Sequence, residues 1–194
     1  MSLIQPGSSP RRALLLVDVI NAFFDERGAF HYPAAGEVLP ALRGLLETAR
    51  RAGRLVVHAR EAHHPGLADH EEKKLPRHCL AGEFDAAFFP GLEPAGVEVE
   101  VRKRRYSAFF ATDLALLLAE QGVEEVLVVG VKTNVCIRAT VQDAFAHGFR
   151  PVVVRGASNS NRPHLHEAVL EDVVHYFGEV VDLDEAVRRL EVAG

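Results

Sequence analysis

The 194-residue sequence has little cysteine and no long hydrophobic run. Two cysteines are too few for the disulfide framework of a small secreted domain, and they indicate a reducing setting in which a thiol serves packing or chemistry. No apolar stretch approaches the roughly 20 residues of a membrane-spanning helix, and the polar start of the chain lacks the apolar centre of a signal peptide. We therefore expect a cytoplasmic protein without a membrane partner, with residues 1–11 as a flexible tail.

An excess of charge of one sign is also lacking. The formal net charge is only -5, and acidic and basic residues are mixed along the chain, so the sequence predicts no nucleic-acid partner. Hydrophobic residues make up 48% of the chain, which is enough for one full core. With no internal repeat or linker, we expect residues 1–194 to form one domain.

Short apolar runs alternate with amphipathic stretches along the chain. The apolar runs are rich in β-branched residues and predict strands at residues 13–19, 54–60, 97–103, 126–131, 151–156 and 179–183. Helical patterns follow at residues 37–53, 111–122, 134–148 and 162–178, and each ends on a glycine, which adopts the left-handed cap conformation at no steric cost. The alternation predicts an α/β protein, a three-layer α/β/α sandwich with a mostly parallel, roughly six-stranded, Rossmann-like sheet.

Two stretches of the sequence indicate what kind of ligand site to expect and where. The turn after the first predicted strand, DVINAFFDERG, lacks the G-x-G-x-x-G sequence that lets a backbone approach a pyrophosphate. Residues 61–96 have four prolines and no sustained period, and a loop of this length in a compact domain is usually functional. We therefore disfavour a dinucleotide-binding module and look for a site near this loop.

Three reactive side chains follow predicted strands. Asp18 ends the first strand, Lys103 ends the third, and Cys136 comes just after the fourth, at the edge where parallel sheets bind ligands. Cys136 is expected in the first turn of a helix, where the helix dipole lowers a thiol pKa. Taken alone, Cys136 is equally well explained as a small core residue, and Asp18 as a strand-end cap. Lys103 lies in a run of cations, yet lysine is scarce in this chain, with four in all.

The segments LLLVDVINAF, KRRYSAFFATDL and GVKTNVCIRATVQDAF occur in an order and spacing that resemble the isochorismatase-like cysteine hydrolase superfamily. The resemblance covers about residues 12–185 and implies the isochorismatase-like α/β/α fold. It also implies a catalytic triad of Asp18, Lys103 and Cys136. A non-proline cis peptide before Lys132 is implied too, with the backbone N–H groups of Lys132 and Cys136 forming an oxyanion hole.

In acyl transfer by such a triad, the aspartate takes the thiol proton and the thiolate attacks a carbonyl carbon. The resemblance therefore implies an amidohydrolase with a thioester intermediate, no organic cofactor, and a homo-oligomeric state, as a dimer or tetramer. A non-catalytic, thiol-bearing binding protein is the alternative from another class. Vinyl-ether hydrolysis of the isochorismate type uses this fold without a cysteine nucleophile, so Cys136 argues against it.

The long loop contains donors for a metal ion. Carboxylate and imidazole ligands suit a divalent ion such as Zn, Mn or Fe, although a solvated polar loop is the plainer explanation for scattered histidines. Nicotinamidases and pyrazinamidases, the branch that the chain resembles most, have an Asp-x-His pair, a further His and a Trp-Pro-x-His-Cys segment. The matching EAH, His70 and LPRHC imply metal ligands Glu61, His63 and His78, with His70 as a further candidate. Cys79 is interpreted as structural.

Two departures from that branch affect the substrate. Glu61 replaces an aspartate, and Leu75 replaces the tryptophan that helps to sandwich a pyridine ring. Phe23 and Tyr106 match pocket positions of the family, and Phe110 is a further candidate, although core packing explains such rings equally well. Nicotinamide, hydrolysed to nicotinate and ammonia, is the first substrate we expect. Metal-free hydrolysis of a ureido or carbamoyl amide is the alternative.

Overall fold

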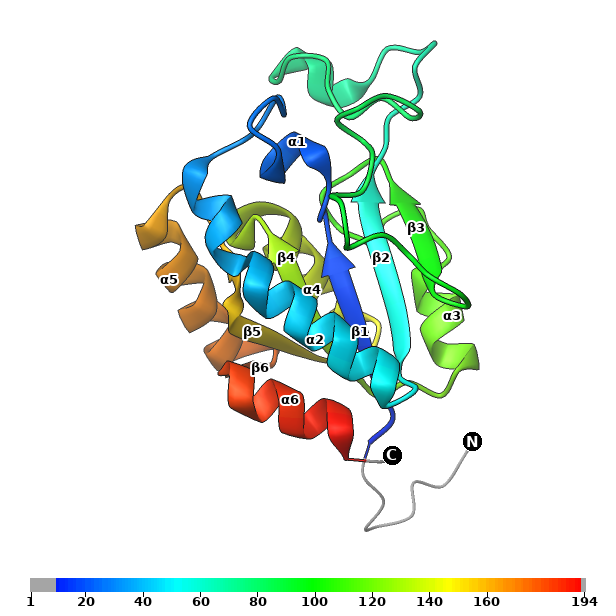
Figure 1. Cartoon of the computed structure of the whole chain (residues 1–194), viewed down its shortest axis with the longest axis vertical. Helices are drawn as coiled ribbons and strands as arrows, with labels where there is room; N and C mark the ends of the chain where they lie inside the picture. Colours follow the sequence, from blue (N-terminus) through cyan, green and yellow to red (C-terminus); the bar gives the residue numbers. More distant parts are fainter. Residues whose placement is uncertain (1–9, 193–194) are drawn as a thin grey trace.

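The structure is a computed structural model and describes residues 10–192 (Figure 1). Its sheet has six strands in the order β3-β2-β1-β4-β5-β6, and every neighbouring pair is parallel. The strands are β1 (Arg12–Val17), β2 (Leu55–Glu61), β3 (Val99–Lys103), β4 (Glu125–Val131), β5 (Arg150–Asn159) and β6 (Glu179–Val181). The predicted six-stranded α/β/α sandwich is confirmed, with a sheet that is parallel throughout. The strand order reverses between β1 and β4, which is where such sheets bind ligands.

Six α-helices accompany the strands in the described residues: α1 (Asn21–Phe24), α2 (Leu39–Arg51), α3 (Leu114–Glu120), α4 (Arg138–Ala146), α5 (Pro163–Asp172) and α6 (Leu183–Glu191). Short 3-10 turns are η1 (Pro33–Val38) and η2 (His70–Lys73), and π-helical turns are η3 (Thr133–Ile137) and η4 (Val173–Phe177). The sequence analysis missed α1, η1 and α6. The predicted last strand extended to residue 183, two residues beyond the observed end of β6 at Val181. Because α6 begins at Leu183, its amphipathic pattern was not recognised as a helix.

The side chains of β1 explain the three layers. Leu14 and Leu16 point into a core shared with α2 and α6, whereas Leu15 and Val17 point into a second core shared with α3, α4 and α5. All four side chains are buried, as expected for a strand covered on both faces. Figure 1 shows α2 and α6 on the near face of the sheet and α3 beyond it. Burial on both faces makes the sheet a rigid frame for the residues at the ends of its strands.

The glycines predicted to end helices behave in two ways. Gly53, Gly122 and Gly148 have φ angles of 61°, 64° and 85°, in the left-handed region, as predicted. The prediction is wrong for Gly178, which has φ -178° and extended backbone. Glycine is required there for space, because a Cβ would lie 2.1 Å from the carbonyl oxygen of Pro151.

The long segment between β2 and β3 extends beyond the carboxyl ends of the strands, above α1 and β2 in Figure 1. Its only helical turn among the described residues is η2. Most of the predicted tail lies outside the described residues, which begin at Pro10. Within residues 10–192, no helix combines the length and the apolar character needed to cross a bilayer.

Candidate active site

Asp18 and Lys103 form a buried ion pair at the carboxyl end of the sheet. Asp18 directly follows β1 with φ 54°, a conformation that is uncommon outside glycine and that turns its carboxylate toward β3. The Lys103 Nζ lies 2.7 Å from Asp18 Oδ2, and neither side chain is exposed. The backbone N–H of Glu61 donates to Asp18 Oδ1 at 2.7 Å. Strands β1, β2 and β3 therefore hold this carboxylate together.

Cys136 completes the group from the other side of β1. It lies in η3, directly after β4, and only 3% of it is exposed. Lys103 Nζ donates to Cys136 Sγ at 3.7 Å. Ligand atoms of Asp18, Glu61 and Cys136 all lie within 4.8 Å of one another. The structure thus brings together the three residues that the resemblance singled out, from positions more than thirty residues apart in the chain.

Burial dominates the ionisation of this group. It raises the pKa of the Asp18 carboxyl and of the Cys136 thiol, against the opposing charge of Lys103. Burial alone would lower the pKa of Lys103, but the charge of Asp18 outweighs it and raises that pKa. The low thiol pKa expected at a helix start is wrong for this site, because desolvation of a buried sulfur is the larger effect. Burial thus favours the neutral form of the Cys136 thiol, and the charge of Lys103 favours the ionised form of Asp18.

The backbone next to Cys136 has the expected form. The peptide bond between Val131 and Lys132 is cis and does not involve proline. Just before it, Gly130 has φ 112°, and a Cβ there would lie 2.1 Å from the carbonyl oxygen of Val17. Only glycine therefore permits β4 to pass so close to β1. The oxyanion hole of Lys132 and Cys136 stays a prediction.

A pocket of about 170 Å³ opens beside Cys136. Its apolar wall includes Phe23, Leu75 and Tyr106, as predicted. The wall also includes Phe30 and Val135, which the sequence analysis missed. The polar lining residues are Glu61, His78, Lys132 and Cys136. Phe30 stacks on Phe23 with ring centroids 5.9 Å apart and meets the edge of His78 at 4.7 Å.

Phe110 does not line this pocket, so its assignment to the pocket is wrong. The side chain is 59% exposed and borders a separate surface hollow beside Arg102 and Arg105. Phe30 and Phe110 both lie outside regular helices and strands, where no periodicity indicates which way a side chain faces. The sequence therefore had no signal that separated the two phenylalanines.

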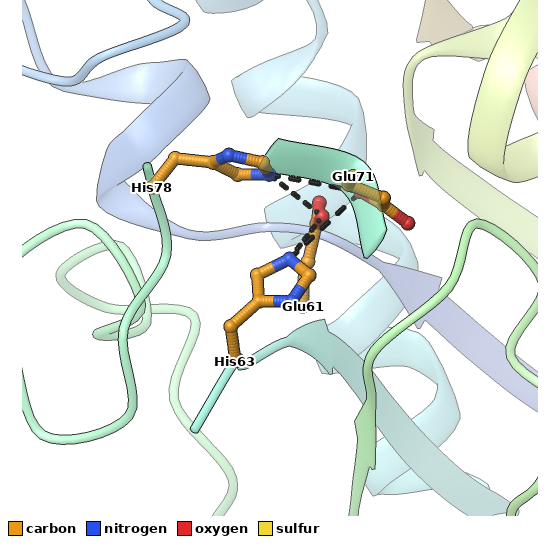
Figure 2. A group of neighbouring side chains, drawn as sticks. All are labelled: Glu61, His63, Glu71 and His78. Atoms are coloured by element: carbon orange, nitrogen blue, oxygen red, sulfur yellow. Dashed lines mark hydrogen bonds and ion pairs between the residues drawn. The ribbon is translucent and has the colours of Figure 1, made fainter. Parts of the chain in front are cut away.

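Four buried ligand residues meet next to the pocket (Figure 2). Ligand atoms of Glu61, His63, Glu71 and His78 lie within 4.8 Å of one another. Glu61 Oε1 lies 2.9 Å from His63 Nε2 and 3.0 Å from His78 Nε2. Glu71 Oε2 is 3.9 Å and 3.8 Å from the same two nitrogens, and neither Glu71 oxygen has a hydrogen-bond partner among the described residues.

The Nδ1 atom of each imidazole faces a neighbouring oxygen, which leaves the Nε2 atom of each ring to bind a cation. His78 Nδ1 donates to the carbonyl oxygen of Pro76 at 2.7 Å, and His63 Nδ1 lies 3.0 Å from the Asp69 carboxylate. A neutral ring with its proton on Nδ1 presents a lone pair at Nε2, which would face the carboxylate of Glu61 without attraction. A proton or a divalent ion between them removes this conflict. The Glu71 carboxylate has no hydrogen-bond partner among the described residues, and Arg105 Nη1 lies 3.8 Å from its Oε1. With this buried oxygen donor, the nitrogen and oxygen donor set fits a divalent metal ion.

The fourth member of this group is Glu71 and not His70. His70 is exposed and lies outside the group. Asp69 Oδ1 accepts from the Glu71 N–H at 3.1 Å and caps η2, and this short turn directs Glu71 inward. Asp69 Oδ1 also accepts from Arg105 Nη1 at 2.8 Å. The sequence contained one local signal for Glu71, an aspartate in a cap position two residues before it.

Cys79 differs from Cys136 in its surroundings. It is buried next to His78 with φ 46°, and burial raises the pKa of its thiol far above the ordinary value. It lines no part of the pocket. This setting agrees with the structural role predicted for it.

The isochorismatase domain family matches residues 12–185. The chain belongs to this family. A maleamate amidohydrolase from Pseudomonas putida is 36% identical over 189 residues, covering 95% of this chain and 89% of the relative. An N-carbamoylsarcosine amidase from an Arthrobacter species is 29% identical over 193 residues, covering 95% and 73%. Both relatives are named for amide hydrolysis, and the isochorismatase-family chain is accordingly a hydrolase of the amidohydrolase type.

Solved structures extend the comparison. An isochorismatase-like hydrolase from Alkaliphilus metalliredigens superposes with a TM-score of 0.85 at 33% identity, covering 92% of this chain and 98% of that one. A nicotinamidase/pyrazinamidase from Bacillus subtilis gives 0.83 at 29%, covering 88% and 99%. A pyrazinamidase from Pyrococcus horikoshii, solved in complex with zinc, gives 0.81 at 30%, covering 89% and 99%. The predicted kinship with this family, including its nicotinamidase members, is confirmed.

Proposed function

We propose that this chain is a cysteine-dependent amidohydrolase that cleaves a small linear amide through a thioester intermediate. The observation that carries the proposal is the convergence of Asp18, Lys103 and Cys136, with the sulfur facing a partly aromatic pocket. A carboxylate with a raised pKa is suited to accept a thiol proton near neutral pH.

In the first half-reaction, Asp18 accepts the thiol proton of Cys136, and the thiolate attacks the amide carbonyl carbon to form a C–S bond. The negative charge that develops on the carbonyl oxygen is received by the backbone N–H groups of Lys132 and Cys136. The C–N bond then breaks, Asp18 returns its proton to the nitrogen, and ammonia leaves. A thioester on Cys136 remains.

In the second half-reaction, water gives a proton to Asp18 and attacks the thioester carbon. The C–S bond breaks, Asp18 returns the proton to the sulfur, and the carboxylic acid leaves. Lys103 keeps Asp18 ionised between these transfers and holds it beside the sulfur, through the 2.7 Å and 3.7 Å contacts of its ammonium. The thiol and the carboxylate end the cycle as they began.

We further propose that Glu61, His63, Glu71 and His78 hold a divalent ion such as Zn, Mn or Fe. When bound, such an ion supplies a Lewis acid at the edge of the pocket. Glu61 and His78 belong both to this group and to the pocket lining, so they place it within reach of a bound substrate. Zinc in the related Pyrococcus pyrazinamidase supports the assignment.

Two substrate types are supported by different observations. The rings of Phe23, Phe30 and Tyr106 favour a flat amide such as nicotinamide, and solved neighbours are named for nicotinamidase and pyrazinamidase activity. Leu75, which replaces the tryptophan of the nicotinamidase branch, removes one aromatic wall and favours an open-chain amide. The relatives named for maleamate and N-carbamoylsarcosine support the open-chain type.

The test is ammonia release from nicotinamide, maleamate and N-carbamoylsarcosine. The wild-type protein is expected to hydrolyse at least one of them. Cys136→Ala should lower turnover by about 10⁴-fold or more, with little change in melting temperature, because the nucleophile is lost while the fold is kept. Acid quenching during turnover should leave an acyl group on Cys136 that mass spectrometry detects. Cys79→Ala, which removes the other thiol, should retain turnover.

Retained turnover in Cys136→Ala would overturn the nucleophile assignment. Absence of ammonia from all three amides with the wild-type protein would instead favour the thiol-bearing binding protein as the function of this chain.

We also propose a homo-oligomer, a dimer or tetramer, in a cytoplasmic setting. Phe145 in α4 and Val174 and Tyr176 in η4 are more than half exposed and lie on neighbouring elements, as an interface between copies would require. The segment 83–92 contains further apolar residues, of which Phe84 is 40% exposed, whereas Phe89 packs against Phe24. Both cysteines are free, in keeping with a reducing compartment. Light scattering measures the oligomeric state.

A further inference from the structure

The side chain of Lys132 lies in the candidate active site, where the sequence analysis expected only its backbone. Its Nζ is 5.5 Å from the ring centroid of Phe23, 5.7 Å from that of Phe30 and 5.3 Å from that of Tyr32. It lines the same pocket as Cys136. Lys132 thus brings an ammonium to the pocket, in addition to the backbone N–H that the proposed mechanism assigns to the oxyanion hole.

This ammonium has no acidic partner among residues 10–192. The carboxylate of the pocket lining, Glu61, is shared between His63 and His78. Burial lowers the pKa of Lys132, because the ammonium has lost water without gaining an ion pair. Arg162, at the start of α5, adds positive charge nearby. This side of the pocket therefore carries positive charge that the more distant Glu61 carboxylate offsets only in part.

The three rings only partly replace the lost water. Ring faces attract a cation, but an ammonium has three N–H donors that need directed acceptors. A carboxylate supplies such acceptors and the missing negative charge in a single group. The rings around it supply flat apolar walls for the body of a small molecule.

We propose that Lys132 is a specificity-determining residue that binds the carboxylate of a substrate that is an amide at one end and an acid at the other. The inference rests on the proposed function, which places the amide carbonyl at Cys136 and its oxygen at the backbone N–H of Lys132. The carboxylate then lies where the side chain of the same lysine ends, so the two groups are separated by a short chain or a small ring. A neutral amide such as nicotinamide leaves the ammonium unpaired.

The first test compares two open-chain amides of equal length, succinamate, which carries a carboxylate, and neutral butyramide. The wild-type protein should prefer succinamate in kcat/KM by at least about tenfold, the worth of a hydrogen-bonded ion pair in a partly buried site. Lys132→Met keeps the length of the side chain and removes its charge, and should abolish most of that preference through KM. Lys132→Arg should restore part of it. Arg51→Met, at the far end of the sheet, controls for the loss of one positive charge.

A wild-type preference for butyramide, or a preference that persists in Lys132→Met, would overturn the proposal. A rate that falls equally for both amides would also overturn it, since that result indicates a purely structural role for Lys132.

A binding measurement separates this proposal from the proposed function. Calorimetry with succinamate on Cys136→Ala, which cannot form a thioester, should give a Kd at least about tenfold lower than on Cys136→Ala/Lys132→Met. If the two variants differ in Kd in this way but the wild-type protein hydrolyses no amide, the amidohydrolase function is overturned and the carboxylate site is retained. Equal binding, or binding to neither variant, would overturn the carboxylate site whatever the turnover.

Discussion

Two buried ionisable groups lie side by side at the carboxyl end of the sheet, and they are built differently. Asp18, Lys103 and Cys136 come from the ends of strands or from the turn directly after one. His63, Glu71 and His78 come from the long segment between β2 and β3. Glu61, the last residue of β2, contacts both groups. The sheet therefore holds one group directly, whereas loop residues must be folded over the edge of the sheet to complete the other.

The two groups also differ in where their positive charge comes from. Lys103 supplies a covalently attached cation 2.7 Å from the Asp18 carboxylate. The second group combines two carboxylates with two imidazoles and contains no lysine or arginine. Arg105 lies at its edge, 3.8 Å from Glu71 Oε1, and a proton or a metal ion would supply positive charge between the imidazoles and the carboxylates. The first group thus holds its cation covalently, whereas we propose that the second takes up a proton or a metal ion.

The largest effect is expected from Lys103→Met, which removes the built-in cation. The buried carboxylate of Asp18 is then unpaired, and breaking a buried pair in this way costs about 3–5 kcal/mol of folding free energy. Turnover should disappear as well. Urea unfolding followed by circular dichroism measures the loss of stability.

Arg102→Met is the matched control, because Arg102 is the exposed neighbour of Lys103 in β3 and pairs with Glu100 at the surface. It should cost less than about 1 kcal/mol. A similar loss of folding free energy in Lys103→Met and Arg102→Met would contradict the expectation that the buried ammonium stabilises the fold more than a surface guanidinium does.

The next effect is expected at the metal group. Glu71→Gln keeps the shape of the side chain but removes its charge. It should weaken zinc binding by at least about 10-fold, because even substitutions of residues behind the ligands typically cost about 10–100-fold. Competition with a chromogenic chelator measures the affinity. The exposed neighbour Glu72 gives the control Glu72→Gln, which should bind zinc like the wild-type protein. His70→Asn should also leave the affinity unchanged, and a loss in that variant would restore His70 as a ligand.

The smallest effect is a pH dependence of stability. Burial alone would lower the pKa of His78, but the Glu61 carboxylate outweighs it, and the pKas of His63 and His78 are both raised. A raised folded-state pKa stabilises the metal-free protein below the ordinary histidine pKa of about 6.5, and this contribution is lost as the pH rises through the raised value.

Zinc requires the neutral imidazoles, so it should raise the melting temperature more at about pH 8 than at about pH 6. Differential scanning fluorimetry with and without zinc measures the two shifts. The substitution Glu71→Gln should reduce both of them. A larger zinc effect at the lower pH would contradict the assignment of His63 and His78 as ligands.

The difference between the two groups also explains what the sequence could predict. Alternating buried strands and helices place Asp18, Lys103 and Cys136 at one edge, because the carboxyl ends of parallel strands all meet there. Glu71 was missed and His70 chosen because residues 61–96 have no period that relates position to direction. Phe30 was missed and Phe110 chosen because both lie in irregular segments, where position also gives no direction. The thiol pKa was predicted to fall because a helix start is visible in a sequence, whereas complete burial of the sulfur is visible only in the fold.

One carboxylate contacts both the proposed metal group and the segment that forms the aromatic wall of the pocket. Asp69 caps η2, faces His63 and accepts from Arg105, whose neighbour Tyr106 forms part of the aromatic wall. Removal of this one carboxylate would therefore release both the Nδ1 atom of His63 and the guanidinium of Arg105 from their contacts.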